Sequence, residues 1–109
     1  FDLGMLYFSP QIWTSDNTDA MVRIKVQYGT SLVYPTRCFG AHIACIPNHI
    51  TGNSTRQRTR AFVAMCGTFG YELDMNTLSM SEIIAYKEYS NLYRNIASII
   101  RSGDLYRLR

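Results

Sequence analysis

The sequence lacks the cysteine pattern of a metal-binding or disulfide-stapled domain. Its 109 residues include three cysteines, an odd number, and no two of them form a Cys-x-x-Cys pair. A structural zinc site or a disulfide framework is therefore not expected. Cys38, Cys45 and Cys66 are better interpreted as free, buried thiols in a reducing compartment, and we accordingly expect a cytoplasmic protein.

Long apolar runs and a strong charge of one sign are also missing. No apolar stretch approaches the ~20 residues of a membrane span, so no membrane partner is expected. Eleven basic and eight acidic side chains leave a net charge of +3, which by itself does not argue for a nucleic-acid partner. His42 and His49 have no recognised metal-ligand spacing, and we expect neither a metal nor another cofactor.

The composition and periodicity are those of a folded domain in which strands and helices alternate. Hydrophobic residues make up 47% of the chain and charged residues 17%. The segment 38–46 is apolar almost throughout, which is typical of a parallel strand buried on both faces. Periodicity predicts, in order, a helical turn at 2–8, a strand at 11–15, a helix at 18–31, a strand at 38–46, a helix at 55–67, a strand at 69–73 and a helix at 81–101.

This order predicts parallel strands joined by right-handed crossovers. Three such units in roughly 95 residues match the repeat of a (β/α)8 barrel, or TIM barrel, which needs about 250 residues for eight units. The predicted fold class is therefore α/β, about three β/α units of a TIM barrel, incomplete as a stand-alone domain. The chain also starts in the middle of an apolar pattern without an initiator Met, and we interpret it as a fragment of a larger protein.

The last predicted helix, at 81–101, carries enough apolar residues to form one buried stripe. Ser79 or Ser81 can cap its start, and Ser102 and Gly103 can end it. The residues expected to be buried along it are Ile84, Tyr86, Leu92, Tyr93, Ile96, Ile99 and Ile100.

Functional side chains of β/α barrels lie at the carboxyl ends of the strands and in the loops that follow. Trp13 lies in the last part of the first predicted strand, and Asp16 and Asp19 follow it. An Asp pair with this spacing usually caps a helix. Alternatively, Asp16 is a proton donor whose pKa is raised by burial beside Trp13. Trp13 is either a core residue or a platform for the apolar face of a sugar ring. The residues around them do not decide between a cap and a proton donor for Asp16, or between a core residue and a sugar platform for Trp13.

Weaker candidates lie in the two later predicted strands and the segments that follow them. A buried, hydrogen-bonded histidine is the favoured interpretation of His42, whereas His49 in the 47–54 turn could contact a ligand. Cys45 could be a nucleophile, but nothing marks it as exposed. Glu72 and Asp74 are expected to have structural roles.

A cluster of arginines provides a hypothesis from a different class. Arg56, Arg58 and Arg60 are expected to form one solvated helix face. Together with Arg107 and Arg109 and the interleaved tyrosines, they could instead form a small basic module that binds nucleic acid.

Several motifs, taken together, resemble one family of enzymes. They are Trp13-Thr14-Ser15-Asp16-Asn17-Thr18-Asp19-Ala20, Gln27-Tyr28-Gly29-Thr30-Ser31, Gly40-Ala41-His42, Pro47-Asn48-His49 and Phe69-Gly70-Tyr71-Glu72-Leu73-Asp74. This set resembles the α-galactosidases of glycoside hydrolase family 36, in clan D. The resemblance extends over essentially the entire chain.

The resemblance implies a retaining hydrolysis of terminal α-1,6-linked galactose from melibiose and raffinose-type sugars. It also implies the C-terminal portion of the TIM barrel, with residues 1–104 in the catalytic domain and 105–109 beginning the next segment. A galactoside is then the expected partner, nucleic acid is not, and the parent enzyme is expected to be a homo-oligomer.

By the same resemblance, Asp16 is the general acid/base, Trp13 contacts substrate and Asp19 is a first-turn helix residue. The family's nucleophile is an aspartate in a Lys-Trp-Asp segment on an earlier strand, and no such segment occurs here. Nor does the sequence contain the family's Cys- and Gly-rich substrate-binding loop. Because retaining glycosidases need two carboxyl groups about 5 Å apart, the fragment alone is expected to be inactive.

Overall fold

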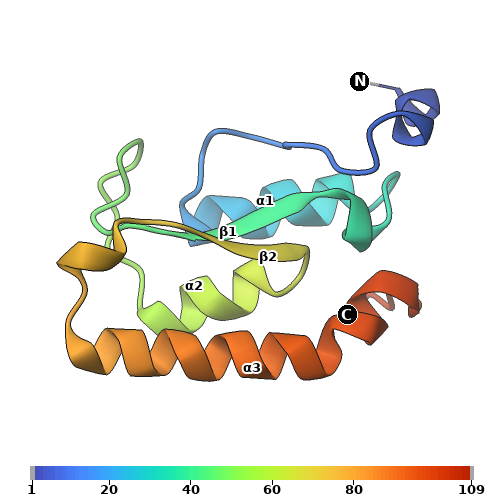
Figure 1. The fold of residues 1–109 in the computed structure, drawn as a ribbon. Helices are drawn as coiled ribbons and strands as arrows, with labels where there is room; N and C mark the ends of the chain where they lie inside the picture. Colours follow the sequence, from blue (N-terminus) through green and yellow to red (C-terminus); the bar gives the residue numbers. More distant parts are fainter. Residues whose placement is uncertain (1, 109) are drawn as a thin grey trace.

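The computed structural model describes residues 2–108, in which helices alternate with two parallel strands (Figure 1). The predicted mixed α/β organisation is confirmed, with most element boundaries within a few residues of the expected ones. The elements in chain order are the 3-10 helix η1 (Leu3–Tyr7), α1 (Ala20–Thr30), η2 (Thr36–Cys38), β1 (Gly40–Ala44), α2 (Gln57–Ala64), β2 (Thr68–Glu72), η3 (Met75–Thr77) and α3 (Met80–Ser102).

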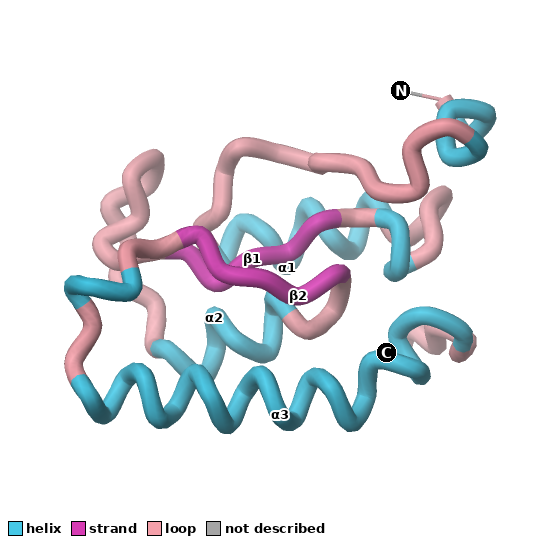
Figure 2. Tube along the Cα trace, viewed as in Figure 1, coloured by secondary structure: helices cyan, strands magenta, loops and turns pink. Residues whose placement is uncertain are grey.

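β1 and β2 pair in parallel, as predicted, and lie side by side in Figure 2. Ala41 is opposite Phe69, and Ile43 is opposite Tyr71. Because side chains alternate along a strand, these four residues share one face of the sheet. His42 therefore belongs to the opposite face.

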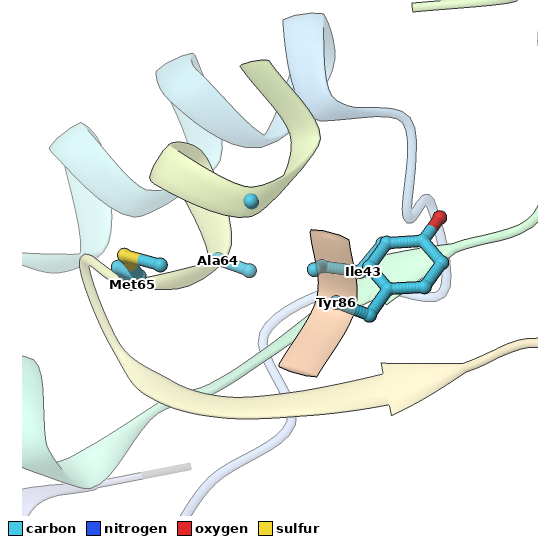
Figure 3. Close-up of a cluster of buried hydrophobic side chains, with 5 residues drawn as sticks. Ile43, Ala64, Met65 and Tyr86 are labelled. Atoms are coloured by element: carbon cyan, nitrogen blue, oxygen red, sulfur yellow. The ribbon is translucent and has the colours of Figure 1, made fainter. Parts of the chain in front are cut away.

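The core lies between the sheet and helices α2 and α3 (Figure 3). Ile43 of β1 is fully buried against Ala61 and Ala64 of α2, Met65 just beyond it, and Tyr86 of α3. The two alanines are small, so the α2 backbone can pack closely on β1. This packing joins the crossover helix to the strand that precedes it.

The buried side of α3 differs from the predicted stripe. Tyr86 is buried, and partly buried Tyr89, Tyr93 and Ile96 continue its row at helical spacing. The expected core residues Ile84, Leu92 and Ile99 are instead exposed. The predicted Tyr86, Tyr93 and Ile96 do pack on the core, and Tyr89 joins them in place of the three exposed residues. The Tyr86 hydroxyl is buried without a partner in residues 2–108, whereas a buried phenol usually finds one. Tyr93 indeed donates to the Gly67 carbonyl.

Ser79 sets the start of α3, which settles the choice between Ser79 and Ser81. The Ser79 hydroxyl accepts from the Glu82 backbone N–H, and the Glu82 carboxylate accepts from the Ser79 backbone N–H at 2.9 Å. This reciprocal pair is a capping box, which satisfies donors at both residues. At its other end the helix stops at Ser102, before Gly103, as predicted.

The prediction of a strand at 11–15 is wrong for the residues after Ile12. Only Ile12 pairs, in a parallel bridge with Phe39, where Ile12 N–H donates to Cys38 O and Gly40 N–H donates to Ile12 O. A parallel ladder would continue with Thr14 N–H donating to Gly40 O. That carbonyl accepts instead from the guanidinium of Arg23. A side chain thus takes the place of the next ladder bond.

Two glycines should respond oppositely to alanine. A Cβ at Gly67 would lie 2.8 Å from the Phe39 carbonyl oxygen, whereas one at Gly29, in exposed helix, would meet nothing within 4 Å. Gly67→Ala should destabilise the protein by about 1–3 kcal/mol through overpacking. Gly29→Ala should stabilise it by about 0.5–1 kcal/mol, because glycine is a poor helix former. Urea unfolding midpoints measure both changes, and equal shifts in the two variants would contradict the packing around Gly67.

Candidate functional site

The functional candidates gather where parallel segments end. In Figure 1 the segment before α1, the loop after β1 and the loop after β2 all leave the sheet at the same end. Trp13 and Asp16 lie in the first of these segments, just beyond the Ile12 bridge. The carboxyl ends of parallel strands are where β/α proteins place their functional side chains.

The structure brings Trp13 and Asp16 together. The indole Nε1 of Trp13 donates to Asp16 Oδ1 at 2.8 Å. The Trp13 side chain is 46% exposed and Asp16 is also exposed. The interpretation of Trp13 as a core residue is therefore wrong. Burial of Asp16 beside Trp13, which the proton-donor alternative expected, is not provided by residues 2–108.

The Trp13 ring rests on the sheet face opposite α2 and α3. Its centroid lies 5.1 Å from that of the His42 ring, with 40° between the planes. A Cβ at Gly40 would lie 3.1 Å from Trp13 Cε3. The glycine therefore lets the indole approach the strand closely. The guanidinium carbon of Arg23 lies 5.5 Å from the Trp13 ring centroid, within the range of a cation–π contact.

Arg23 is a buried residue at the centre of a hydrogen-bond network, and its role was not predicted from the sequence. It is only 3% exposed and donates to Thr14 Oγ1 at 2.7 Å, to Gln27 Oε1 at 3.2 Å and to the Gly40 carbonyl. Burial lowers the pKa of the guanidinium, and the nearby charge of Glu72 partly offsets this effect. The available signal was a pair of charged residues, Arg23 and Lys25, within the otherwise apolar run Met21 to Val26.

Asp19 is the N-cap of α1, not a first-turn residue as expected. Its Oδ1 accepts from Met21 N–H at 2.9 Å, while Oδ2 accepts from the Thr51 hydroxyl at 2.6 Å and from the Asn53 amide. The side chain is 3% exposed. The Thr51 hydrogen bond, helped by those from Met21 and Asn53, lowers the pKa of the carboxyl although burial opposes this shift.

The loop after β1 is organised around a buried asparagine. Asn48 Oδ1 accepts from the backbone N–H groups of Ile50 and Thr51, and its Nδ2 donates to Thr18 Oγ1 at 3.2 Å. Gly52 adopts a φ of 72°, the left-handed region that favours glycine. His49, the possible ligand contact in this loop, is exposed.

His42 differs from its expected role as a hydrogen-bonded core histidine. Its side chain is half-buried beside Trp13, and its buried Nδ1 has no hydrogen-bond partner among residues 2–108. Gly70, its neighbour on β2, leaves room for the imidazole, because a Cβ there would lie 2.4 Å from His42 Cδ2.

The prediction that Arg56, Arg58 and Arg60 form one solvated helix face is wrong for Arg60. Arg60 is 6% exposed and donates to the carbonyls of Ala44 and Thr55, whereas Arg56 and Arg58 are exposed. Arg60 therefore ties α2 to the end of β1. It is not available to the basic surface that the nucleic-acid hypothesis requires.

The remaining candidate residues are the three cysteines, Glu72 and Asp74. Of the three cysteines, Cys38 is buried as expected, but Cys45 and Cys66 are exposed. Glu72 is exposed at the end of β2. Asp74 has a structural role, as expected, because its carboxylate accepts from Asn76 N–H at the start of η3.

Neither a metal centre nor a membrane span emerges from the described part of the chain. No group of three or more His, Cys, Asp or Glu side chains in residues 2–108 is arranged to hold a metal ion. Within the same residues, no helix combines the length and apolarity needed to cross a membrane.

Known proteins resemble the chain in sequence and in structure. Residues 1–103 match the family described as Melibiase. The α-galactosidase AgaA of Geobacillus stearothermophilus is 50% identical over 108 residues, which are 99% of this chain and 15% of AgaA. The bifunctional α-galactosidase/sucrose kinase AgaSK of Mediterraneibacter gnavus is also 50% identical over 108 residues, 99% of this chain and 12% of that protein.

Solved structures agree with the sequence comparison. A crystal structure of a variant of AgaA, a GH36 α-galactosidase, in complex with raffinose matches the whole chain with a TM-score of 0.97 at 49% identity. This chain covers 15% of that structure. The chain therefore spans about 15% or less of the length of these relatives.

The hydrogen bonds of Asp19 predict a pH-dependent contribution to stability. Its folded-state pKa is lowered, so the contribution is present above the unfolded value of about 3.9 and is lost as pH falls through the folded value. Asp19→Asn should cost about 1–3 kcal/mol at pH 7. The cost should shrink as pH falls from 7 to below the unfolded value, where the carboxyl is protonated first in the unfolded and then in the folded state. Unfolding free energies across this range measure the effect, and a cost independent of pH would contradict an ionised Asp19.

Proposed function

The chain belongs to the Melibiase family, and we propose that it forms part of the catalytic domain of a retaining α-galactosidase. The substrates proposed are melibiose and raffinose-type sugars, from which the enzyme removes terminal α-1,6-linked galactose. Support comes from the names of the relatives, which are α-galactosidases, and from the raffinose bound by one of them. The AgaA variant with raffinose is a GH36 α-galactosidase, and membership of glycoside hydrolase family 36, in clan D, is part of the proposal.

The fold we propose for the whole domain is a TIM barrel, with this chain in its C-terminal portion. Residues 1–104 would belong to the barrel, and 105–109 would begin the next segment. The parallel pairing of β1 with β2 and the parallel bridge of Ile12 to Phe39 support this proposal, as does the crossover helix α2 packed on β1. The face that carries His42 would then line the barrel interior.

In this proposal Asp16 is the general acid/base. It would donate a proton to the leaving glycosidic oxygen and then, as a carboxylate, take a proton from the attacking water. The observation that carries this role is its exposed position beside Trp13, at the end of the sheet where the parallel segments finish. A second carboxyl group about 5 Å away must act as nucleophile, and we assign it to a Lys-Trp-Asp segment elsewhere in the enzyme.

Trp13 is proposed to contact the substrate through the exposed part of its ring. His42, Gly40 and Arg23 contact the indole, which restricts the orientations that its remaining surface can adopt. The hydrogen bond from Nε1 to Asp16 couples the position of the ring to that of the proton donor. An apolar sugar face placed on the indole would therefore lie beside the acid.

The proposal also includes the activity of the chain alone, the need for a cofactor, the location of the enzyme and its oligomeric state. The chain alone is expected to be inactive, because it supplies one of two catalytic carboxyl groups. No cofactor is required by a mechanism that uses two carboxyl groups and water. A cytoplasmic location and a homo-oligomeric enzyme remain part of the proposal.

Asp16→Ala in the intact enzyme tests the acid/base assignment. The kcat/KM for raffinose should fall by about 10²–10⁴-fold, the usual contribution of general acid–base catalysis. The kcat/KM for an aryl α-galactoside with a strongly acidic phenol should fall far less, because that leaving group departs without a proton. Steady-state kinetics with both substrates measure the two ratios. Normal raffinose hydrolysis by the variant would exclude Asp16 as the acid/base.

Two further measurements make this test specific. Added azide should attack the galactosyl–enzyme intermediate of the Asp16→Ala variant and yield α-galactosyl azide, whereas loss of the nucleophile would yield the β product. Asp104→Ala removes an exposed aspartate that lies beyond α3 and serves as the matched control. Its kinetics should equal those of the wild type with both substrates.

A further inference from the structure

The segment that carries Asp16 is held by side chains, not by a strand ladder. Its regular pairing ends at Ile12. Beyond that point, Asn17 N–H donates to Ser15 Oγ at 3.1 Å, and Asp19 N–H donates to Asn17 Oδ1 at 3.1 Å. These bonds shape the segment internally. They do not fix where it lies relative to the neighbouring loops.

Asp19 provides the connection to the neighbouring loop. Its Oδ2 accepts from Thr51 and Asn53, both in the loop after β1. Next to it, Thr18 Oγ1 accepts from Asn48 of the same loop. Thr18, Asp19 and Asn48 are 5%, 3% and 5% exposed, whereas Thr51 and Asn53 are exposed, so the connection is buried on its Asp19 side and open to water on its outer side. We call these five residues the inter-loop clamp.

Helix capping uses only one of the two oxygens of the Asp19 carboxylate. Oδ1 accepts from Met21 N–H and thereby caps α1, a task that a serine or threonine hydroxyl also performs. Oδ2 takes no part in the cap and is used entirely across the two loops. Burying a carboxylate is costly unless its oxygens are hydrogen-bonded, so a cap alone does not explain an aspartate here.

We propose that Asp19 is a positioning residue for the general acid/base Asp16, acting through the inter-loop clamp. The proposal rests on the proposed function. Asp16 is three residues before Asp19 on the same segment. The clamp therefore holds the C-terminal end of this segment, close to the point from which Asp16 projects. Proton transfer needs heavy-atom distances of about 2.6–3.2 Å, and displacements of about 1 Å cost on the order of 10²-fold in rate.

Asp19→Ser in the intact enzyme separates the clamp from the cap. Serine can still accept from Met21 N–H, but its side chain is too short to reach Thr51 and Asn53 as well. The kcat/KM for raffinose should fall about tenfold or more, whereas that for the aryl α-galactoside with an acidic phenol should change less than about threefold. A purely structural loss would lower both values equally, since it would reduce the fraction of folded enzyme.

Thr51→Val approaches the clamp from the other loop and tests it even if Asp19→Ser fails to fold. It removes the hydroxyl that donates to Asp19 and accepts from Asn53 N–H, while keeping the side-chain shape. It should show the same preference for the aryl substrate, and the double variant should be no worse than Asp19→Ser. Ser79→Ala is the matched control, because it removes the α3 N-cap and leaves the clamp intact. Its two kcat/KM values should stay in the wild-type ratio.

The outcomes separate the two proposals. If Asp16→Ala spares the aryl substrate but Asp19→Ser and Thr51→Val lower both values equally, Asp19 has only a structural role and this inference is wrong. If Asp16→Ala lowers both values equally, the acid/base assignment itself fails. Wild-type kinetics in folded Asp19→Ser would also overturn the positioning role.

Discussion

The buried guanidinium of Arg23 determines how the segment that carries Trp13 and Asp16 leaves the sheet. It occupies the Gly40 carbonyl that a third parallel strand would use and also binds Thr14. Taking a guanidinium out of water is costly, so its donors must find partners. Gln27 accepts from Arg23 and donates to the Val63 carbonyl, which extends the network from α1 to α2. One side chain thereby ties the Trp13 segment, β1 and two helices together.

This constraint gives the two faces of the sheet different characters. On one face Ile43 and its neighbours pack against α2 and α3. On the other, Gly40 and Gly70 leave room for Trp13 and His42. The buried Nδ1 of His42, without a partner in residues 2–108, belongs to this second face. Buried polar atoms are nearly always hydrogen-bonded, so contacts with further groups are expected on this face. The Tyr86 hydroxyl on the α3 side is likewise buried without a partner in residues 2–108.

Periodicity and capping chemistry predicted the helices and a serine cap at Ser79 or Ser81, because these depend on residues close together in sequence. The parallel pair β1–β2 joins residues 28 positions apart and was predicted from the alternation of strands and helices. The contacts of Arg23 and Arg60 could not be predicted in this way, since each binds a carbonyl 16 or 17 positions away. The predicted stripe of α3 is correct for Tyr86, Tyr93 and Ile96 and wrong for Ile84, Leu92 and Ile99, which are exposed. The alternation of strands and helices places Trp13 and Asp16 at the functional end of a strand, local chemistry leaves their roles open, and only the resemblance assigns those roles.

Asp16 and Asp19 show how position separates two identical side chains. Asp19 is enclosed and accepts from Met21, Thr51 and Asn53, which stabilise its anion and hold the pKa of the carboxyl low. Such a group serves as a permanent acceptor and is poorly suited to giving up and regaining a proton. Asp16 is exposed and accepts from the Trp13 indole. A general acid/base must meet substrate and water in turn, so the exposed aspartate suits the chemistry and the enclosed one suits the support.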